Sequence, residues 1–203
     1  MKKLLSALMT SSLLFVGTSP VYASGYTSAY AKVINNPHGA LKNQISYYEK
    51  YMEEKINVGR YFTYDLNKDG TPELFLLGKG NWKGFNFVAT YRNGKAVILN
   101  SQFTVPTRIN KARNCWISEG HLWGGGGYEE IQALGIKNKK LYEKAYFDDA
   151  PGDYELRENG YRLKGTKGNY NKLKNKYYKN TKSIYAFKSY KRSNSRGLTH
   201  QSK

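Results

Sequence analysis

The chain has almost no cysteine: Cys115 is the only one among 203 residues, which excludes an intramolecular disulfide. Secreted eukaryotic domains of this size usually carry several disulfides. After the first 23 residues there is also no apolar run long enough to cross a membrane as a helix. Cys115 is followed by Trp116 and Ile117 in a strand-like segment, which predicts a buried, unreactive thiol. A catalytic thiol, the alternative, would need a histidine partner that the sequence does not place.

Acidic residues are missing after Glu158, although the whole chain has a formal charge of +18. Thirteen lysines and arginines and six tyrosines lie between Asn159 and Lys203. Such an asymmetric excess favours binding to a polyanion, and a merely solvated basic face is the alternative. The residues expected to contact a polyanion are Lys172, Lys174, Lys176, Lys179, Lys182, Lys191 and Arg192.

The first 23 residues predict a secretory signal peptide. Lys2 and Lys3 precede an apolar stretch, and Val21-Tyr22-Ala23 has the small-x-small pattern of a cleavage site. Cleavage after Ala23 removes these two lysines and leaves a formal charge of +16. With a single cysteine, this pattern suits extracellular export from a Gram-positive bacterium. The polyanions found there are cell-wall and membrane-anchored teichoic acids, anionic lipid and extracellular DNA.

The patterning predicts an α+β fold, with an N-terminal amphipathic helix packed on a curved antiparallel β-meander and a short second helix near the C-terminus. The first helix begins at Pro37, and its apolar stripe is formed by Leu41, Ile45, Tyr48, Met52 and Ile56. From Gly59 onward, nine short segments alternate with a period of two, as strands do. They are joined by the turn pairs Asn93-Gly94, Asn138-Lys139 and Asn159-Gly160.

The second helix is expected to turn Tyr170, Leu173 and Tyr177 to one side. A last strand is expected over residues 183–191, in the segment SIYAFKSYK. The predicted organisation is a signal peptide over 1–23, a flexible leader over 24–35, a single domain over 36–190 and a basic disordered tail over 191–203.

The segment DLNKDGTPE, residues 65–73, predicts a calcium site. Taking Asp65 as position 1, Asn67 and Asp69 fall at positions 3 and 5 and Glu73 at position 9, while the Thr71 carbonyl at position 7 is a further ligand. Gly70 allows the sharp turn between them. The segment is not an EF-hand loop, because position 12 is Leu76 and strands flank it. A metal-free polar turn is the alternative, since Asp and Asn side chains also hydrogen-bond their own turn backbone.

The acidic segment resembles the strand-loop-strand calcium loop of FG-GAP and VCBS-type repeats. Over most of residues 40–190, the chain also resembles secreted Firmicutes proteins and lipoproteins that carry one hairpin of the YDxDxDGxxEL type, most of them of unknown function. The resemblance implies calcium ligation by the Asp65, Asn67, Asp69 and Glu73 side chains and by the Thr71 backbone. It implies nothing about an activity.

These features predict a secreted, calcium-stabilised, basic binding or structural protein of the cell surface or cell wall, without enzymatic activity. The alternative is a secreted hydrolase acting on cell-wall material, with catalytic acids among Glu119, Glu129 and Glu130. Glycoside hydrolysis needs two carboxylates across a cleft, and Glu129 and Glu130 are neighbours that a strand directs to opposite faces.

Overall fold

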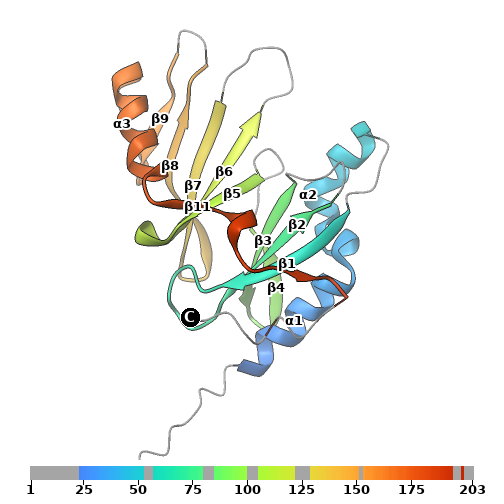
Figure 1. Ribbon diagram of the computed structural model, residues 1–203. Helices are drawn as coiled ribbons and strands as arrows, with labels where there is room; N and C mark the ends of the chain where they lie inside the picture. The colour runs from blue at the N-terminus through green and yellow to red at the C-terminus, as the bar shows by residue number, and fades with distance from the viewer. Residues whose placement is uncertain are drawn as a thin grey trace, which may run out of the picture.

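The computed structural model describes residues 23–52, 57–79, 85–99, 105–121, 129–150, 153–193 and 198. These residues form two antiparallel sheets, three α-helices and two short 3-10 helices, Lys111–Arg113 and Ile184–Ala186 (Figure 1). The fold is therefore α+β with β-structure predominating, which agrees with the predicted class. Residues 1–22 of the predicted signal peptide lie outside the described residues.

The first sheet has the strand order β12-β1-β2-β3-β4, and helices α1 and α2 cover one of its faces (Figure 1). Tyr30 and Ile34 of α1 and Leu41 of α2 are fully buried against Tyr61 and Leu74 of the sheet. The elements are α1 (Ala23–Asn35), α2 (Pro37–Met52), β1 (Val58–Tyr64), β2 (Glu73–Gly78), β3 (Asn86–Arg92), β4 (Lys95–Ile98) and β12 (Tyr190–Lys191).

The second sheet has the order β10-β9-β8-β7-β6-β5-β11, and α3 packs on its outer face. Tyr170, Leu173 and Tyr177 of α3 are buried against Ile117 and Phe147, as the predicted stripe requires. The elements are β5 (Val105–Asn110), β6 (Cys115–His121), β7 (Glu129–Lys137), β8 (Lys140–Asp148), β9 (Leu156–Glu158), β10 (Tyr161–Arg162), α3 (Lys167–Tyr178) and β11 (Thr181–Ser183).

The inner faces of the two sheets share a third core. Because side chains alternate along a strand, Tyr61 points to the helices while Phe62 points to the other sheet. Phe62 stacks on Phe75 at 4.7 Å between ring centroids and on Phe187 at 5.0 Å, and Trp116 of the second sheet belongs to the same cluster. The layers therefore follow the order α1 and α2, first sheet, second sheet, α3.

The nine predicted strands and the three predicted hairpin turns are present. Each turn has two consecutive residues with positive φ, which matches the right-handed twist of the flanking strands. The φ values are 50° and 76° at Asn93-Gly94, 52° and 57° at Asn138-Lys139, and 52° and 83° at Asn159-Gly160.

Two predictions about the architecture were wrong. The strands divide into two packed sheets rather than one meander, because apolar side chains on both faces of β1, β2 and β6 need partners on both sides. Residues 24–35, predicted to be a flexible leader, belong to α1. Tyr26, Tyr30, Val33 and Ile34 recur at helical spacing there and pack onto the first sheet.

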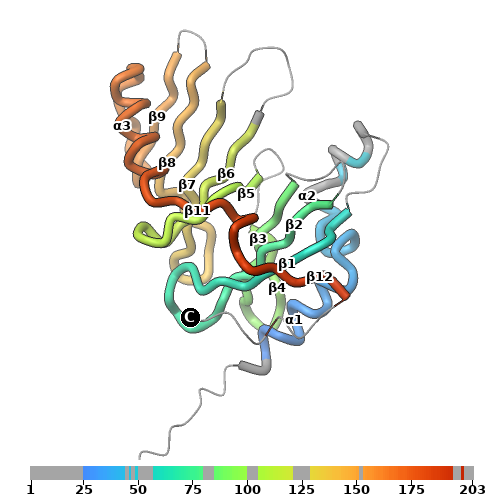
Figure 2. The backbone as a smooth tube through the Cα atoms, viewed as in Figure 1, coloured from blue at the N-terminus to red at the C-terminus, as the bar shows by residue number. Residues whose placement is uncertain are grey.

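The C-terminal segment also differs from its prediction, because it crosses from one sheet to the other (Figure 2). Residues 183–191 do not form one strand: β11 pairs with β5, a 3-10 helix follows, and β12 pairs with β1. Part of the predicted disordered tail is ordered, since Lys191 lies in β12 and Leu198 is buried in the first-sheet core. The rest of the tail beyond Ser193 lies outside the described residues, as does Ile56 of the predicted helical stripe.

Candidate functional site

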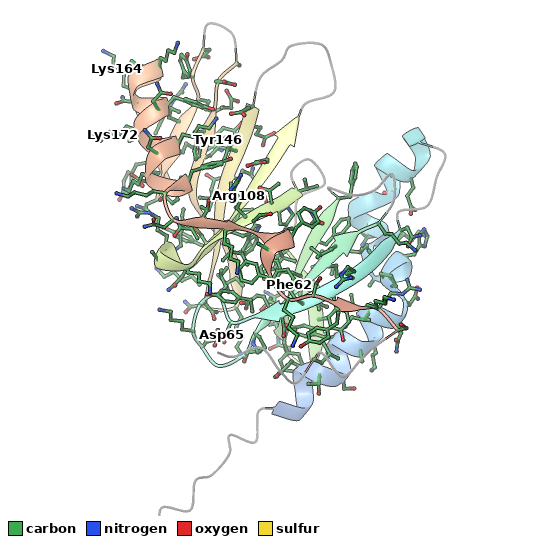
Figure 3. The ribbon with its side chains drawn as sticks, in the orientation of Figure 1. Phe62, Asp65, Arg108, Tyr146, Lys164 and Lys172 are labelled. Atoms are coloured by element: carbon green, nitrogen blue, oxygen red, sulfur yellow. The ribbon has the colours of Figure 1, made fainter. Side chains whose placement is uncertain are left out.

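The acidic segment forms the loop between β1 and β2, at one end of the first sheet, where Figure 3 labels Asp65. Antiparallel pairing of Tyr64 with Glu73 closes the base of the loop. Lys68 and Gly70 take positive φ values of 60° and 84°, which turn the chain sharply twice. The sequence prediction of a glycine-assisted turn between two strands is confirmed.

The side chains of the loop turn inward and bind the loop's own backbone. The two carboxylate oxygens of Asp65 accept hydrogen bonds from the amides of Asp69 and Gly70, at 3.2 and 2.9 Å. Asn67 Oδ1 accepts from the Asp69 amide at 3.2 Å, and Asp69 Oδ1 accepts from the Thr71 amide at 2.8 Å. The oxygen atoms of Asp65, Asn67 and Asp69 are therefore held in place by backbone amides of the same loop.

Glu73 is the buried member of the predicted ligand set, with 1 % of its surface exposed. Its Oε2 accepts a hydrogen bond from the Leu66 amide at 2.9 Å, and its Oε1 accepts one from the Thr90 hydroxyl at 3.4 Å. The pKa of Glu73 is raised to about 8, mainly by burial and in smaller part by the charges of Asp69 and Asp65, while the hydrogen bond from Leu66 opposes the increase. An ionised Glu73 would therefore be repelled by the charges of Asp65 and Asp69.

The donor set fits calcium in its chemistry, because carboxylate, amide and backbone oxygens are the ligands that this ion prefers. In the described part of the chain, however, no three acidic, histidine or cysteine side chains converge as a metal-ligand group. The oxygens are arranged around backbone amides, as in the metal-free turn. Calcium binding would exchange some of these hydrogen bonds for metal contacts and would take the proton from Glu73.

Helix α1 ties this loop to the first-sheet core through Tyr30, which the sequence did not single out. The fully buried Tyr30 hydroxyl donates to the Pro72 carbonyl oxygen at 2.8 Å, directly beside Glu73. Burial and the nearby charge of Glu73 raise the pKa of Tyr30 well above its usual range. The helical spacing of Tyr26, Tyr30, Val33 and Ile34 was the sequence signal that could have predicted a buried helix here, with Tyr30 on its inner face.

The residues predicted to bind a polyanion lie in three places. Lys172, Lys174, Lys176 and Lys179 belong to α3 and its C-cap, Lys182 to β11, and Lys191 and Arg192 to β12 and the turn after it. Lys174 pairs with Glu129 and Lys176 with Glu158, the latter at 2.7 Å. In Figure 3, Lys164 and Lys172 lie at the opposite end of the molecule from Asp65. The acidic loop and the basic helix are thus separate features.

Three of the tyrosines interleaved with these lysines are occupied within the fold. Tyr170 and Tyr177 are buried in the core under α3. Tyr178 is half-buried and donates to Glu119 Oε1 at 2.5 Å. These three rings are therefore not exposed platforms on which nucleobases could stack.

The three acids of the hydrolase alternative do not share one face. Glu119 binds the Tyr178 hydroxyl and Glu129 binds the Tyr170 hydroxyl, so both lie under α3. Glu130 contacts Gln132 on the other face, where burial and the charge of Asp148 raise its pKa. Glu130 therefore cannot act together with either of the others across one cleft.

Cys115 is fully buried in the core beneath α3. Burial raises the pKa of its thiol to about 11, against the lowering effect of Lys144 and Arg113. The thiolate needed for nucleophilic chemistry is therefore disfavoured at this position. The predicted burial of Cys115 is confirmed.

None of the helices in the described residues is both long and apolar enough to cross a membrane. A comparison of the chain with protein-family models, curated proteins and solved structures found no significant match. The resemblance to FG-GAP and VCBS-type calcium loops and to secreted Firmicutes proteins stays a prediction.

Proposed function

We propose that the protein is a secreted, non-enzymatic binding protein of the bacterial cell surface, which attaches to anionic wall polymers such as teichoic acid. The observation that carries this proposal is the exposure of its C-terminal cations. Of the eleven lysines and arginines between Asn159 and Ser193, ten are exposed and Lys174 is half-buried. This stretch contains no acid, and ion pairs to acids elsewhere are described for Lys174 and Lys176.

Exposed cations without nearby carboxylates favour a polyanion because each phosphate that they contact releases condensed counterions. The released ions gain entropy, so the affinity is large at low salt and falls steeply as salt is added. The alternative, a basic face that is only solvated, would bind no polyanion at any salt concentration. The buried tyrosines favour a wall polymer over extracellular DNA, because the rings under α3 are closed to stacking.

Calcium stabilisation of the acidic loop is the second part of the proposal. It is supported by the oxygens of Asp65, Asn67 and Asp69 that the loop backbone holds in place, and by the repulsion that Asp65 and Asp69 would exert on an ionised Glu73. A divalent ion would offset this repulsion and hold β1 and β2 together at the loop. Its role would be structural, because it would hold the loop that joins β1 and β2.

The attachment is tested by incubating the mature protein with purified Gram-positive cell walls and eluting it with a salt gradient. We expect retention at low ionic strength and release by about 0.5 M sodium chloride. Walls from which the phosphate polymer has been chemically removed are the control, and they should retain little protein. Retention that is indifferent to salt, or equal on the stripped walls, would contradict the proposal.

A further inference from the structure

A basic groove runs along the outer edge of the first sheet, away from both the acidic loop and α3. It consists of two adjoining cavities of about 470 and 510 Å³, which share Arg60, Gly78 and Lys79 as lining residues. The first cavity continues along β12, and the second extends towards Tyr185 in the 3-10 helix Ile184–Ala186. The groove thus joins residues from the first half of the domain to its C-terminal segment.

The described lining of this groove carries positive charge and no negative charge. Its five cations are Arg60, Lys79, Lys188, Lys191 and Arg192, and no acid lines either cavity. The ion pairs found among the described residues do not include Lys79, Lys191 or Arg192, all of which are exposed. Like charges held this close repel one another, and an anion in the groove would relieve the repulsion.

The backbone of β1 and β12 fixes the positions of these cations. Arg60 pairs with Lys191 across the sheet, and the Arg192 amide donates to the Gly59 carbonyl oxygen at 3.2 Å. Gly59 also lets Lys79 pass close by, because a Cβ at Gly59 would lie 2.8 Å from the Lys79 Cβ. These four cations are therefore brought to one strip of surface by sheet pairing and a glycine contact rather than by side-chain flexibility.

Arg60 is oriented by the C-terminal segment. Its Nε and Nη2 donate to the Ser189 hydroxyl and carbonyl oxygens at 2.8 and 2.7 Å. A guanidinium group has five N–H donors, and these bonds use two of them. A planar group held in this way suits the paired oxygens of a phosphate, which arginine binds with two parallel hydrogen bonds.

We propose that this groove is the binding site for the phosphate groups of a poly(alditol phosphate) chain, such as a glycerol or ribitol phosphate polymer. This inference rests on the proposed attachment to anionic wall polymers and locates that attachment in the groove. The groove favours such a chain over nucleic acid because Tyr185 is its only exposed large ring among the described residues. Single-stranded nucleic acids are bound on successive aromatic platforms, which the groove lacks.

The test compares two triple variants that remove the same charge from two surfaces. The groove variant is Lys79→Gln, Lys191→Gln and Arg192→Gln, and the helix variant is Lys167→Gln, Lys172→Gln and Lys179→Gln. All six side chains are exposed, and Arg60 is left intact because it holds Ser189. Thermal melting first confirms that each variant is folded. Binding of a fluorescent poly(glycerol phosphate) chain, and of single-stranded DNA with the same number of phosphates, is then measured between low and physiological salt.

We expect the groove variant to bind poly(glycerol phosphate) roughly tenfold or more weakly than the wild type at physiological salt, with a shallower dependence of affinity on salt. The helix variant should lose much less. Equal losses in the two variants, or a larger loss in the helix variant, would overturn the groove while leaving polyanion binding intact. Stronger wild-type binding to the DNA would overturn the assigned ligand class. No wild-type binding to either polymer would instead refute the proposed function itself.

Discussion

The buried carboxylate of Glu73 accepts a hydrogen bond from the backbone amide of Leu66 at 2.9 Å, so the end of the acidic loop is bound to its beginning. This contact places an ionisable group inside the fold at the point where β1 and β2 separate. The stability of the protein and its response to calcium should both depend on the protonation of this one side chain.

Raising the pH should destabilise the metal-free protein through Glu73. Its pKa in the fold, about 8, lies above its ordinary value of 4.5, so folding favours the protonated form. The stabilising contribution is complete below pH 4.5, declines as the pH rises and is lost above pH 8. Within that window the loss is about 1 kcal/mol per pH unit. Denaturant unfolding between pH 5.5 and about 8.5 measures it.

The matched control for this prediction is Glu73→Gln, which keeps an oxygen acceptor for the Leu66 amide and cannot titrate. Its unfolding free energy should vary less with pH than that of the wild type over the same window. Parallel pH profiles for the two proteins would show that another group is responsible.

Calcium should raise the melting temperature of the wild type, and Asp69→Ala should abolish the effect. The expected dissociation constant is roughly 10⁻⁴ to 10⁻³ M, because the bidentate glutamate of an EF-hand is missing. At ten times that constant, binding adds about 1.4 kcal/mol of stability, or roughly 3–6 °C. The effect should be larger at pH 8.5 than at pH 6.5, because the ion competes with the proton on Glu73.

Asp153→Ala serves as the control for the calcium prediction, since Asp153 is an exposed acid outside the loop. It should respond to calcium as the wild type does. Identical melting curves for the wild type with calcium and with a chelator would remove the calcium site and leave the polar turn.

The thiol of Cys115 should be inert in the folded protein. It is fully buried, and its pKa of about 11 disfavours the reactive thiolate. An Ellman titration at pH 8 should label it only as fast as the protein unfolds, and fully in denaturant. Rapid, stoichiometric labelling of the native protein would reopen a role for Cys115 as a nucleophile.

Removing the ring of Phe62 should cost more stability than almost any other single change. Phe62 is fully buried between the sheets and stacks on both Phe75 and Phe187. Phe62→Ala should lower the free energy of unfolding by about 3–5 kcal/mol, from lost burial and the cavity left behind. The control is Tyr161→Ala, where the ring is 76 % exposed and the change should stay within about 0.5 kcal/mol.

Elements that depend on local patterns could be predicted from the sequence. Period-two runs and Asn-containing turns located nine strands, and three apolar or aromatic residues at helical spacing located α3. Strand β5 was missed because Pro106 and Asn110 interrupt its apolar character. Strand β11 was not predicted and β12 was merged into one longer strand over 183–191, because two or three residues carry no recognisable period and their pairing depends on distant strands.

The same distinction applies to the sites. The acidic loop is contiguous, so its residues could be named from their spacing alone. The residues of the basic groove are not contiguous. Arg60 and Ser189 are hydrogen-bonded although they lie 129 positions apart in the sequence, and no local pattern connects them. Lys191 and Arg192 were predicted as polyanion contacts from composition, whereas Arg60 and Lys79 became candidates only when β12 placed them together.

The crossing of the C-terminal segment has a consequence for biogenesis. A chain leaves the ribosome with its N-terminus first. Because β11 and β12 supply the outermost partners of β5 and β1, neither sheet acquires its last strand until residues 181–191 have emerged. Until then both sheets keep an open edge, which is aggregation-prone and incompletely stabilised. Completion of both sheets therefore waits for a segment that is synthesised after all their other strands.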